Sequence, residues 1–374
     1  MIIDIEAGAE GRPSAEARAV EQRGAGQPWL SILVPVYDVE PYVEECLHSI
    51  LDQLGGDPGI ELILLDDRST DGSAALCERI IADSPANMRL MRHEANRGVS
   101  GARNSLLQAA TGHYIWYVDP DDRMLPNAIN GLRQIIDTAQ PDMVLCDYVR
   151  SDNVAIPAFR GPAGQLLRYK ESLIAGVFAN RRMHLWTKIC KRTLFDTIRF
   201  PDGAWFEDIA TVPWLLLKAE TFYYTAEPWI FYRSRPGSII AQVARMRGEF
   251  NTRRYDDMAE ALAGFRHDLR STLLHIAPET EFFIGRFLAR EYYKLFKRLI
   301  RARRQWANWH EARAELRRYR EMMEENSPLS FTELVRQYVH RGHWGLALGL
   351  YMALTMSGGA SGNHRPTPVR PRPA

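Results

Sequence analysis

Short, almost wholly apolar segments alternate with helical patterns between Leu30 and Tyr148. The segments SILVPV, IELILL and YIWYV contain few polar residues, and Val43, Leu47 and Ile50 follow the first of them at helical spacing. A strand that is apolar on both faces has to be covered by helices on both sides, which is typical of parallel sheets. The alternation therefore predicts an α/β fold with a Rossmann-like, mostly parallel sheet flanked by helices.

Beyond this region the pattern becomes helical, and the two ends of the chain have no periodicity. Phe283, Phe287, Phe296 and Ile300 fall on one side of an amphipathic helix. The first residues are rich in Gly, Ala, Glu and Arg, and the last in Pro, Gly and Arg. We therefore expect a disordered tail over 1–28, an α/β domain over 29–240, a helical region over 241–356 and a disordered tail over 357–374.

The charge balance and the cysteines exclude several kinds of protein. Lys and Arg total 47 against 46 acidic residues, so the net charge of +1 provides no broad field for binding nucleic acid. The four cysteines contain no C-x-x-C pair, which favours buried thiols in a reducing compartment over a zinc site. The sequence has neither a secretory signal nor an apolar run of about 18 residues, so we expect a cytoplasmic protein without a membrane span.

Acidic residues follow the YIWYV strand as Asp119-Pro120-Asp121-Asp122. Ligands of parallel sheets bind outside the carboxyl ends of the strands, where Asp119 and Asp121 are expected to lie. Mg²⁺ and Mn²⁺ prefer oxygen ligands and are commonly held by one or two carboxylates together with substrate phosphates. We expect Asp119 and Asp121 to bind such a cation, although aspartates at this place can also cap the following helix.

Polar residues also follow the first two strands. Asp67 comes directly after IELILL, where its carboxylate could accept the imide N–H of a uracil ring, and Tyr37 follows SILVPV, where its ring could stack on the base. The run from Asp66 to Gly72 is also rich in turn residues, and it predicts Asp71 as the N-cap of the next helix. Both interpretations can hold for different residues of the run.

A glycine-rich helix start follows MRLMRH, which we expect to be the third strand, as Asn96-Arg97-Gly98-Val99-Ser100-Gly101-Ala102-Arg103-Asn104. The glycines permit close backbone approach, and a helix N-terminus together with Arg97 and Arg103 would suit a diphosphate. The segment matches neither the G-x-G-x-x-G fingerprint nor a P-loop. By itself it is weak evidence for a phosphate site.

A second acidic pair, Glu207-Asp208, precedes the apolar run Ile209 to Leu217. A carboxylate here could act as a general base that removes a proton from a hydroxyl group. The pair is equally an ordinary acidic first turn, which the helix dipole favours. The spacing alone favours the second of these roles.

Taken together, these segments resemble family 2 glycosyltransferases of the GT-A fold. The resemblance lies in SILVPVYDVEPYVEECLHSIL, ELILLDDRSTDGS and NRGVSGARNSLLQAATGHYIWYVDPDD, which occur in the order and spacing of that family. A weaker match continues through WTKICKRTLF, WFEDIA and FYRSRPGSI to about Ile240. One departure is Arg68, which stands where the family usually has glycine.

The resemblance implies an inverting transfer of a sugar from a nucleotide-diphosphate sugar, most commonly a UDP-sugar, to an acceptor hydroxyl. It implies Asp208 as the base, and Asp119 and Asp121 as the Mg²⁺ or Mn²⁺ motif with Asp121 as the direct ligand. With the arginines of the glycine-rich segment, the expected nucleotide-sugar-binding residues are Pro35, Val36, Tyr37, Glu40, Asp67, Arg97, Arg103 and Asp119. The acceptor would be a sugar, a lipid-linked molecule or another hydroxyl compound in cell-envelope, exopolysaccharide or glycoconjugate synthesis.

Two other functions remain open from the sequence. A sugar nucleotidyltransferase would use a similar sheet and metal, but it should carry a glycine-rich loop with a basic residue after the first strand, where Val36-Tyr37-Asp38 stand. A non-catalytic binding or scaffold protein could retain the same fold. Retention of Asp67, Asp119, Asp121 and Asp208 together argues against that second alternative.

The helical region combines arginines with aromatic residues. The arginines are Arg286, Arg290, Arg298, Arg301, Arg303 and Arg304, and the aromatic residues are Phe283, Phe287, Tyr292, Tyr293, Phe296 and Trp306. Such a surface could lie against an anionic membrane, at its inner face. The alternative, which the core spacing of the aromatic residues favours, is a helical cap that packs its aromatic side on the catalytic domain or on a second subunit.

Overall fold

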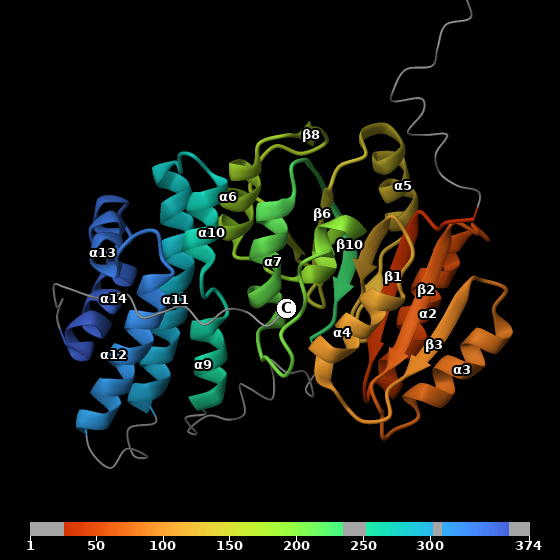
Figure 1. Cartoon of the computed structure of the whole chain (residues 1–374), viewed down its shortest axis with the longest axis horizontal. Helices are drawn as coiled ribbons and strands as arrows, with labels where there is room; N and C mark the ends of the chain where they lie inside the picture. The colour runs from red at the N-terminus through yellow and green to blue at the C-terminus, as the bar shows by residue number, and fades with distance from the viewer. Residues whose placement is uncertain (1–25, 235–251, 302–308, 359–374) are drawn as a thin grey trace, which may run out of the picture.

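The computed structural model describes residues 26–234, 252–301 and 309–358, and its first part is an α/β unit (Figure 1). In chain order its main elements are β1 (Leu30–Val36), α2 (Glu40–Leu54), β2 (Ile60–Asp66), α3 (Ser73–Asp83), β3 (Met88–Arg92), α4 (Gly98–Ala109), β4 (Tyr114–Tyr117), β5 (Arg123–Met124), α5 (Ala128–Ala139), β6 (Met143–Arg150), β7 (Ala155–Ile156), β8 (Leu166–Leu167), α6 (Lys170–Asn180), η1 (Leu185–Thr187), β9 (Lys188–Lys191), η2 (Arg192–Phe195), α7 (Glu207–Lys218) and β10 (Phe222–Tyr232).

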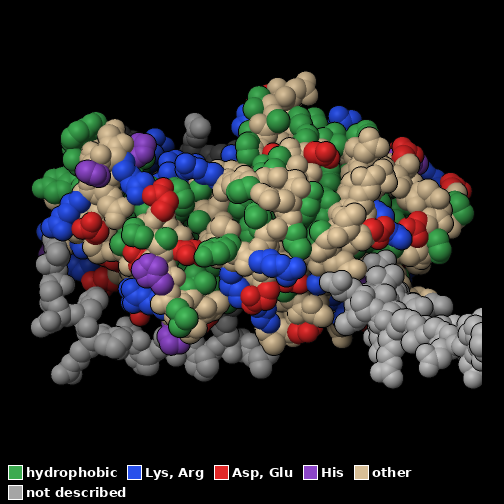
Figure 2. Space-filling view, turned by 90° about the horizontal axis from the view of Figure 1, so that it is seen from above, with side chains coloured by type: hydrophobic (Ala, Val, Ile, Leu, Met, Phe, Trp, Pro, Cys, Tyr) green, Lys and Arg blue, Asp and Glu red, His purple; other side chains and the backbone are tan. Residues whose placement is uncertain are grey.

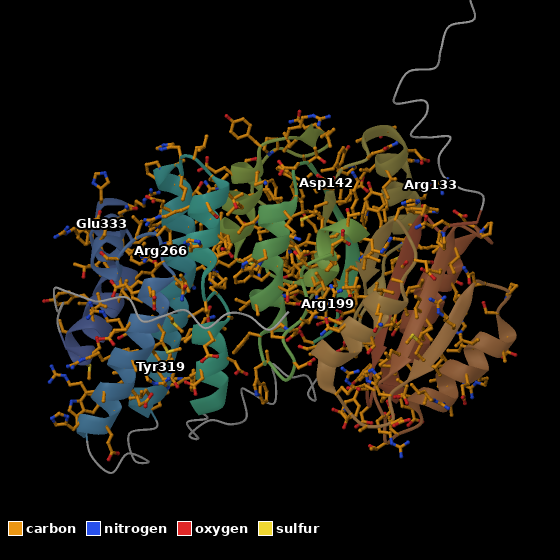
Figure 3. All side chains as sticks on the ribbon, in the orientation of Figure 1. Arg133, Asp142, Arg199, Arg266, Tyr319 and Glu333 are labelled. Carbon is orange, nitrogen blue, oxygen red and sulfur yellow. The ribbon has the colours of Figure 1, made fainter. Side chains whose placement is uncertain are left out.

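The strands form one mixed sheet in the order β3-β2-β1-β4-β9-β6-β10-β5. The first four of these are parallel to one another, and β6 and β10 are also parallel. Strand β9 lies antiparallel between β4 and β6. Asp142, labelled in Figure 3, directly precedes β6 and links it to its two neighbours. Its carboxylate accepts hydrogen bonds from Lys191 Nζ at the end of β9 (2.8 Å) and from the Thr221 N–H before β10 (3.0 Å).

Both faces of the sheet are buried, as the apolar strands predict. Ile32 and Leu62 belong to one core cluster, together with residues of α2, α3 and α5, whereas the neighbouring Leu33 and Ile63 belong to the other, together with residues of α4, α6 and α7. Successive side chains of a strand point to opposite faces, so a wholly apolar strand requires a helical layer on each side.

The register of the sheet brings the ends of β1, β2 and β4 to one edge. Val36 is the partner of Asp66, and the Asp67 N–H donates to the Val36 carbonyl at 2.8 Å. On the other side of β1, the Val118 N–H donates to the Leu33 carbonyl at 3.0 Å. The residues that follow these strands therefore meet at the carboxyl edge, as expected for a parallel sheet.

The later helices pack on the α/β unit and share its core. They are α9 (Thr252–Glu260), α10 (Phe265–Thr272), α11 (Pro278–Arg301), α12 (Trp309–Glu325), α13 (Phe331–His340) and α14 (Trp344–Ser357). In Figure 1 α10 and α11 stand beside α6 and α7. The ring of Phe178 on α6 lies 5.6 Å from that of Phe287 on α11, and Arg286 donates to the Ala179 carbonyl at 2.7 Å.

This packing corrects the membrane hypothesis for the aromatic residues of α11. Phe283, Phe287, Tyr292 and Phe296 are at most 8% exposed, so these side chains are unavailable to a lipid surface. The alternative of a helical cap on the catalytic domain describes their position. Arg303, Arg304 and Trp306 lie outside the described residues.

The expected segment boundaries fall mostly outside the described residues, including the boundary at 240 and the tails over 1–25 and 359–374. Two differences are visible. Gln27 donates to the Thr111 carbonyl and Pro28 accepts from the His113 N–H, so ordered contacts begin before residue 29, and Ser357 ends α14. The four cysteines are buried free thiols, as expected. Within the described ranges, no helix has the length and apolar character needed to cross a membrane.

Candidate active site

Three aspartates gather directly after β4. One carboxylate oxygen from each of Asp119, Asp121 and Asp122 lies within 4.8 Å of the others. Asp122, which was not predicted as a ligand, is only 2% exposed. Its Oδ1 accepts the Arg233 N–H at 2.8 Å, whereas its Oδ2 has no hydrogen-bond partner among the described residues. Burial raises the pKa of Asp122 well above its ordinary value. Clustered carboxylates with an unsatisfied buried oxygen fit a hard divalent cation, which prefers oxygen ligands.

The guanidinium of Arg103 joins this cluster to the acidic pair of α7. The side chain is 3% exposed, and its Nη2 lies 3.4 Å from Asp119 Oδ1. Its Nη1 lies 2.6 Å from Asp208 Oδ1 and 3.0 Å from Glu207 Oε1. Arg103 therefore contacts three carboxylates, and both of its terminal nitrogens are engaged by them. A direct contact of Arg103 with a diphosphate remains a prediction.

Burial and charge shift the protonation of this cluster. Burial raises the pKa of Asp119 to about 6, against the opposing effect of Arg103. Burial also raises the pKa of Glu207 to about 7, again opposed by Arg103. A single buried cation thus holds several carboxylates that would otherwise repel one another.

Glu207 and Asp208 lie in the first turn of α7, so both interpretations of this pair describe the structure. Asp208 lies near the end of β4, because its Oδ1 accepts a hydrogen bond from Arg103. Its Oδ2 accepts the Leu185 N–H at 3.4 Å. The base candidate and the metal motif, which are far apart in the sequence, therefore share one guanidinium. Sequence spacing could not show this, because α6, β9 and the loops between them separate β4 from α7.

The expected nucleotide-binding residues lie at the ends of β1 and β2. Asp67 is 2% exposed, and its Oδ1 lies 2.6 Å from His93 Nδ1 and accepts the Arg97 N–H at 2.9 Å. Tyr37 is 45% exposed beside this edge, so its ring is accessible. His93 was not predicted, although it directly follows β3, where a functional residue of a parallel sheet is expected.

The other residues that we expect to contact the nucleotide lie in β1 and at the start of α2. Pro35 and Val36 are buried in β1, and Glu40 Oε2 accepts the Gly72 N–H at 2.9 Å. Gly72 rather than Asp71 occupies the N-cap position of α3, and Asp71 Oδ1 accepts the Ser73 N–H at 3.0 Å.

Arg68 replaces the usual glycine of the family in this turn. Its φ is 66°, within the left-handed region that glycine adopts without strain. The turn therefore retains the backbone shape that the glycine would provide.

A groove of about 1010 Å³ runs along α2 and the β5–α5 segment. Glu40, Glu44 and His48 are among its lining residues, whereas Asp119, Asp121 and Asp208 are not. The groove therefore does not include the carboxylate cluster. We take the carboxylate cluster, and not this groove, as the candidate active site.

Comparisons with known proteins agree with this geometry. The family described as Glycosyl transferase family 2 matches residues 31–205. Glycosyltransferase GlyG of Streptococcus pneumoniae is 30% identical over 245 residues, which are 63% of this chain and 78% of GlyG. The minor teichoic acid biosynthesis protein GgaB of Bacillus subtilis is 29% identical over 229 residues, which are 58% of this chain and only 24% of GgaB.

Among solved structures, S. aureus TarS 1–349 in complex with UDP-GlcNAc superposes with a TM-score of 0.65 at 19% identity, over 88% of this chain and 92% of that chain. The likeness covers the α/β sheet and the later helices, and it confirms the expected GT-A fold. With this fold, the match over residues 31–205 and the relation to GlyG, the chain belongs to the family 2 glycosyltransferases.

Proposed function

We propose that this enzyme transfers a sugar from a UDP-sugar to an acceptor hydroxyl, with inversion at the anomeric carbon, in the synthesis of a cell-envelope polysaccharide or a related glycoconjugate. The UDP-GlcNAc complex of TarS supports the class of donor, and the teichoic acid role in the name of GgaB supports the class of product. The placement of Tyr37 and Asp67 at the ends of β1 and β2 suits a nucleotide base.

In this proposal Asp119 and Asp121 hold Mg²⁺ or Mn²⁺, with Asp122 beside them. When bound, the cation offsets negative charge on the diphosphate of the donor. Asp208 accepts the proton of the attacking hydroxyl, and Arg103 and the Leu185 N–H hold its two oxygens in one orientation. The acceptor oxygen attacks from the face opposite the leaving group, so the anomeric configuration inverts.

The observation that carries this proposal is the single guanidinium of Arg103 between Asp119 and Asp208. It places the proposed base beside the proposed metal motif, which is what a one-step displacement requires. The test is a screen of nucleotide sugars for release of the nucleoside diphosphate, with Mg²⁺, Mn²⁺ or EDTA. Asp121→Asn should abolish release, and the exposed Asp83→Asn serves as the matched control.

A sugar nucleotidyltransferase would give a different result in this screen. It would consume a nucleoside triphosphate and a sugar phosphate, and it would release pyrophosphate. A non-catalytic scaffold would bind nucleotide without release of any product. The carboxylate cluster around Arg103 favours an enzyme over a scaffold, because its burial of several acids is costly without a chemical role.

We also propose that α14 lies on an anionic lipid surface, where a lipid-linked acceptor would be reached. Trp344, Leu348 and Tyr351 are 66%, 60% and 56% exposed on this helix, which contains no charged residue. Trp and Tyr favour the interface of a membrane, and the sequence after the helix contains three arginines and no acid. Figure 2 shows hydrophobic side chains among both basic and acidic ones at the end of the molecule formed by the later helices. Pairing of α14 with a second copy is the alternative outcome of the test.

A further inference from the structure

Three aromatic rings form a stack beside the carboxylate cluster. The rings of His184 and Trp186 lie 4.8 Å apart at 13°, and those of Trp186 and Tyr232 lie 5.8 Å apart at 10°. Tyr148 packs edge-on against Trp186 at 4.9 Å and 86°, and it also meets the other two rings edge-on. Trp186 is 3% exposed, whereas His184 and Tyr232 at the two ends of the stack are partly exposed.

The two ends of the stack are tied to the two halves of the site. Next to His184, the Leu185 N–H donates to Asp208 Oδ2 at 3.4 Å. Next to Tyr232, the Arg233 N–H donates to Asp122 Oδ1 at 2.8 Å. The stack therefore spans from the proposed base to the aspartates after β4, and neither the nucleotide contacts nor the metal motif uses it.

A buried lysine fixes the segment that carries the stack. Lys188 is 1% exposed, and its Nζ donates to the Arg182 carbonyl (2.7 Å), the His184 carbonyl (2.8 Å) and Thr187 Oγ1 (3.1 Å). Burial lowers the pKa of His184 to about 4, so its ring is neutral near pH 7. The stack is therefore uncharged near pH 7, and hydrogen bonds from Lys188 hold the backbone at Arg182 and His184.

We propose that the His184–Trp186–Tyr232 stack is the wall of an acceptor subsite that takes a pyranose ring and presents one of its hydroxyls to Asp208. This inference rests on the proposed function and names the acceptor class. A pyranose has flat C–H faces that pack on aromatic rings and a rim of hydroxyls that meets carboxylates, and ligand sites combine such apolar walls with a few polar groups. A linear polyol phosphate offers no such face.

The first test measures how the enzyme partitions its donor between water and a sugar acceptor. The donor is the nucleotide sugar found in the screen, and the acceptors are p-nitrophenyl pyranosides, with ribitol 5-phosphate as the linear polyol. For Tyr232→Leu and His184→Ala we expect the KM for the pyranoside to rise about ten-fold, and transfer to fall more than donor hydrolysis does. Tyr232→Phe should retain the wild-type KM. Tyr169→Leu, at a tyrosine that is 74% exposed and outside the stack, is the matched control and should change neither value.

The second test does not depend on turnover. Saturation-transfer NMR with methyl pyranosides, UDP and Mg²⁺ should show contact to the ring C–H protons in the wild type and lose it in Tyr232→Leu. Absence of this contact in the wild type overturns the acceptor subsite, even if the enzyme hydrolyses its donor. Preference for ribitol 5-phosphate over every pyranoside, or an equal fall of transfer and hydrolysis in the variants, also overturns it. Failure to hydrolyse any nucleotide sugar, with the NMR contact present, counts instead against the proposed function.

Discussion

Arg103 Nη1 lies 2.6 Å from Asp208 Oδ1, and the same guanidinium reaches Asp119 through its other terminal nitrogen at 3.4 Å. Arg103 lies on α4, and its guanidinium thus links the end of β4 to the start of α7. This arrangement makes the orientation of Asp208 dependent on Arg103, and it gives the first prediction.

Arg103→Lys should lower kcat by about 100-fold, because one ammonium cannot keep the forked contacts to Asp208, Glu207 and Asp119. Arg103→Met should in addition lower the free energy of unfolding by about 3–5 kcal/mol, since several buried carboxylates lose their partner. Steady-state kinetics and urea denaturation measure the two effects. Wild-type kcat in Arg103→Lys would remove the positioning role.

Asp121→Asn should abolish nucleotide release and leave the melting temperature within a few degrees of the wild type, because it changes a partly exposed residue at the edge of the sheet. Addition of EDTA to the wild type should have the same effect on activity, and Mg²⁺ or Mn²⁺ should restore it. Activity that is indifferent to EDTA would contradict a metal-dependent reaction.

Glu61 on β2 provides a test of acid stability outside the site. Burial by itself would raise the pKa of Glu61, but hydrogen bonds from Ser31 and Thr111 bring it below its ordinary value of 4.5. A carboxyl group whose folded pKa is lowered stabilises the fold above its unfolded pKa, and this contribution is lost as the pH falls through the folded pKa.

Glu61→Gln should therefore cost about 1–3 kcal/mol of unfolding free energy near neutral pH. The difference from the wild type should shrink in acid, as the pH falls below 4.5 and through the lowered pKa of folded Glu61. Urea denaturation across this pH range measures it, and an equal difference at every pH would show that Glu61 acts without its charge.

How much the sequence could predict depends on how local each feature is. The apolar runs predict β1, β2 and β4, and the metal motif at Asp119 and Asp121 is predicted from its place directly after a strand. Insertion of β9 between β4 and β6 could not be predicted, because its pairing is set by contacts across the chain. The link from Arg103 to Asp208 was missed for the same reason.

The helical region shows a second limit of sequence patterns. Aromatic residues at helical spacing indicate a buried face, but the pattern does not say what covers it. Phe287 could have met a lipid, a second subunit or the catalytic domain, and it packs on Phe178 of α6. Several exposed apolar residues, such as Leu348 and Tyr351, are on α14 instead, where the short apolar stretch has no amphipathic pattern to distinguish its faces.

The shared core predicts that the C-terminal helices unfold together with the catalytic unit. Phe287→Ala should lower the free energy of unfolding by about 3–5 kcal/mol, as for other buried aromatic residues. In calorimetry the variant should still unfold in a single transition, at a lower temperature than the wild type. Trp309→Ala, at a residue that is 46% exposed, is the control. Two separate transitions in the wild type would indicate an independent helical domain.

The lipid contact of α14 predicts binding to anionic vesicles in a flotation assay at low salt. Leu348→Glu with Tyr351→Glu should abolish flotation, because charges on this face oppose insertion at the interface. Tyr169→Glu, at another exposed tyrosine, should float like the wild type. If the wild type does not float but elutes as a dimer that Leu348→Glu dissociates, the face pairs with a second copy instead.

In this account Asp208 acts as the base while other residues hold the donor, and Asp208→Asn tests this division of roles most directly. The measurement compares kcat for sugar transfer with the Kd for UDP in the presence of Mg²⁺. We predict that kcat falls by about 1000-fold or more while the Kd changes by less than about three-fold, because the base acts only in the transition state. Transfer at the wild-type rate, or a loss of UDP affinity as large as the loss of kcat, would contradict this account.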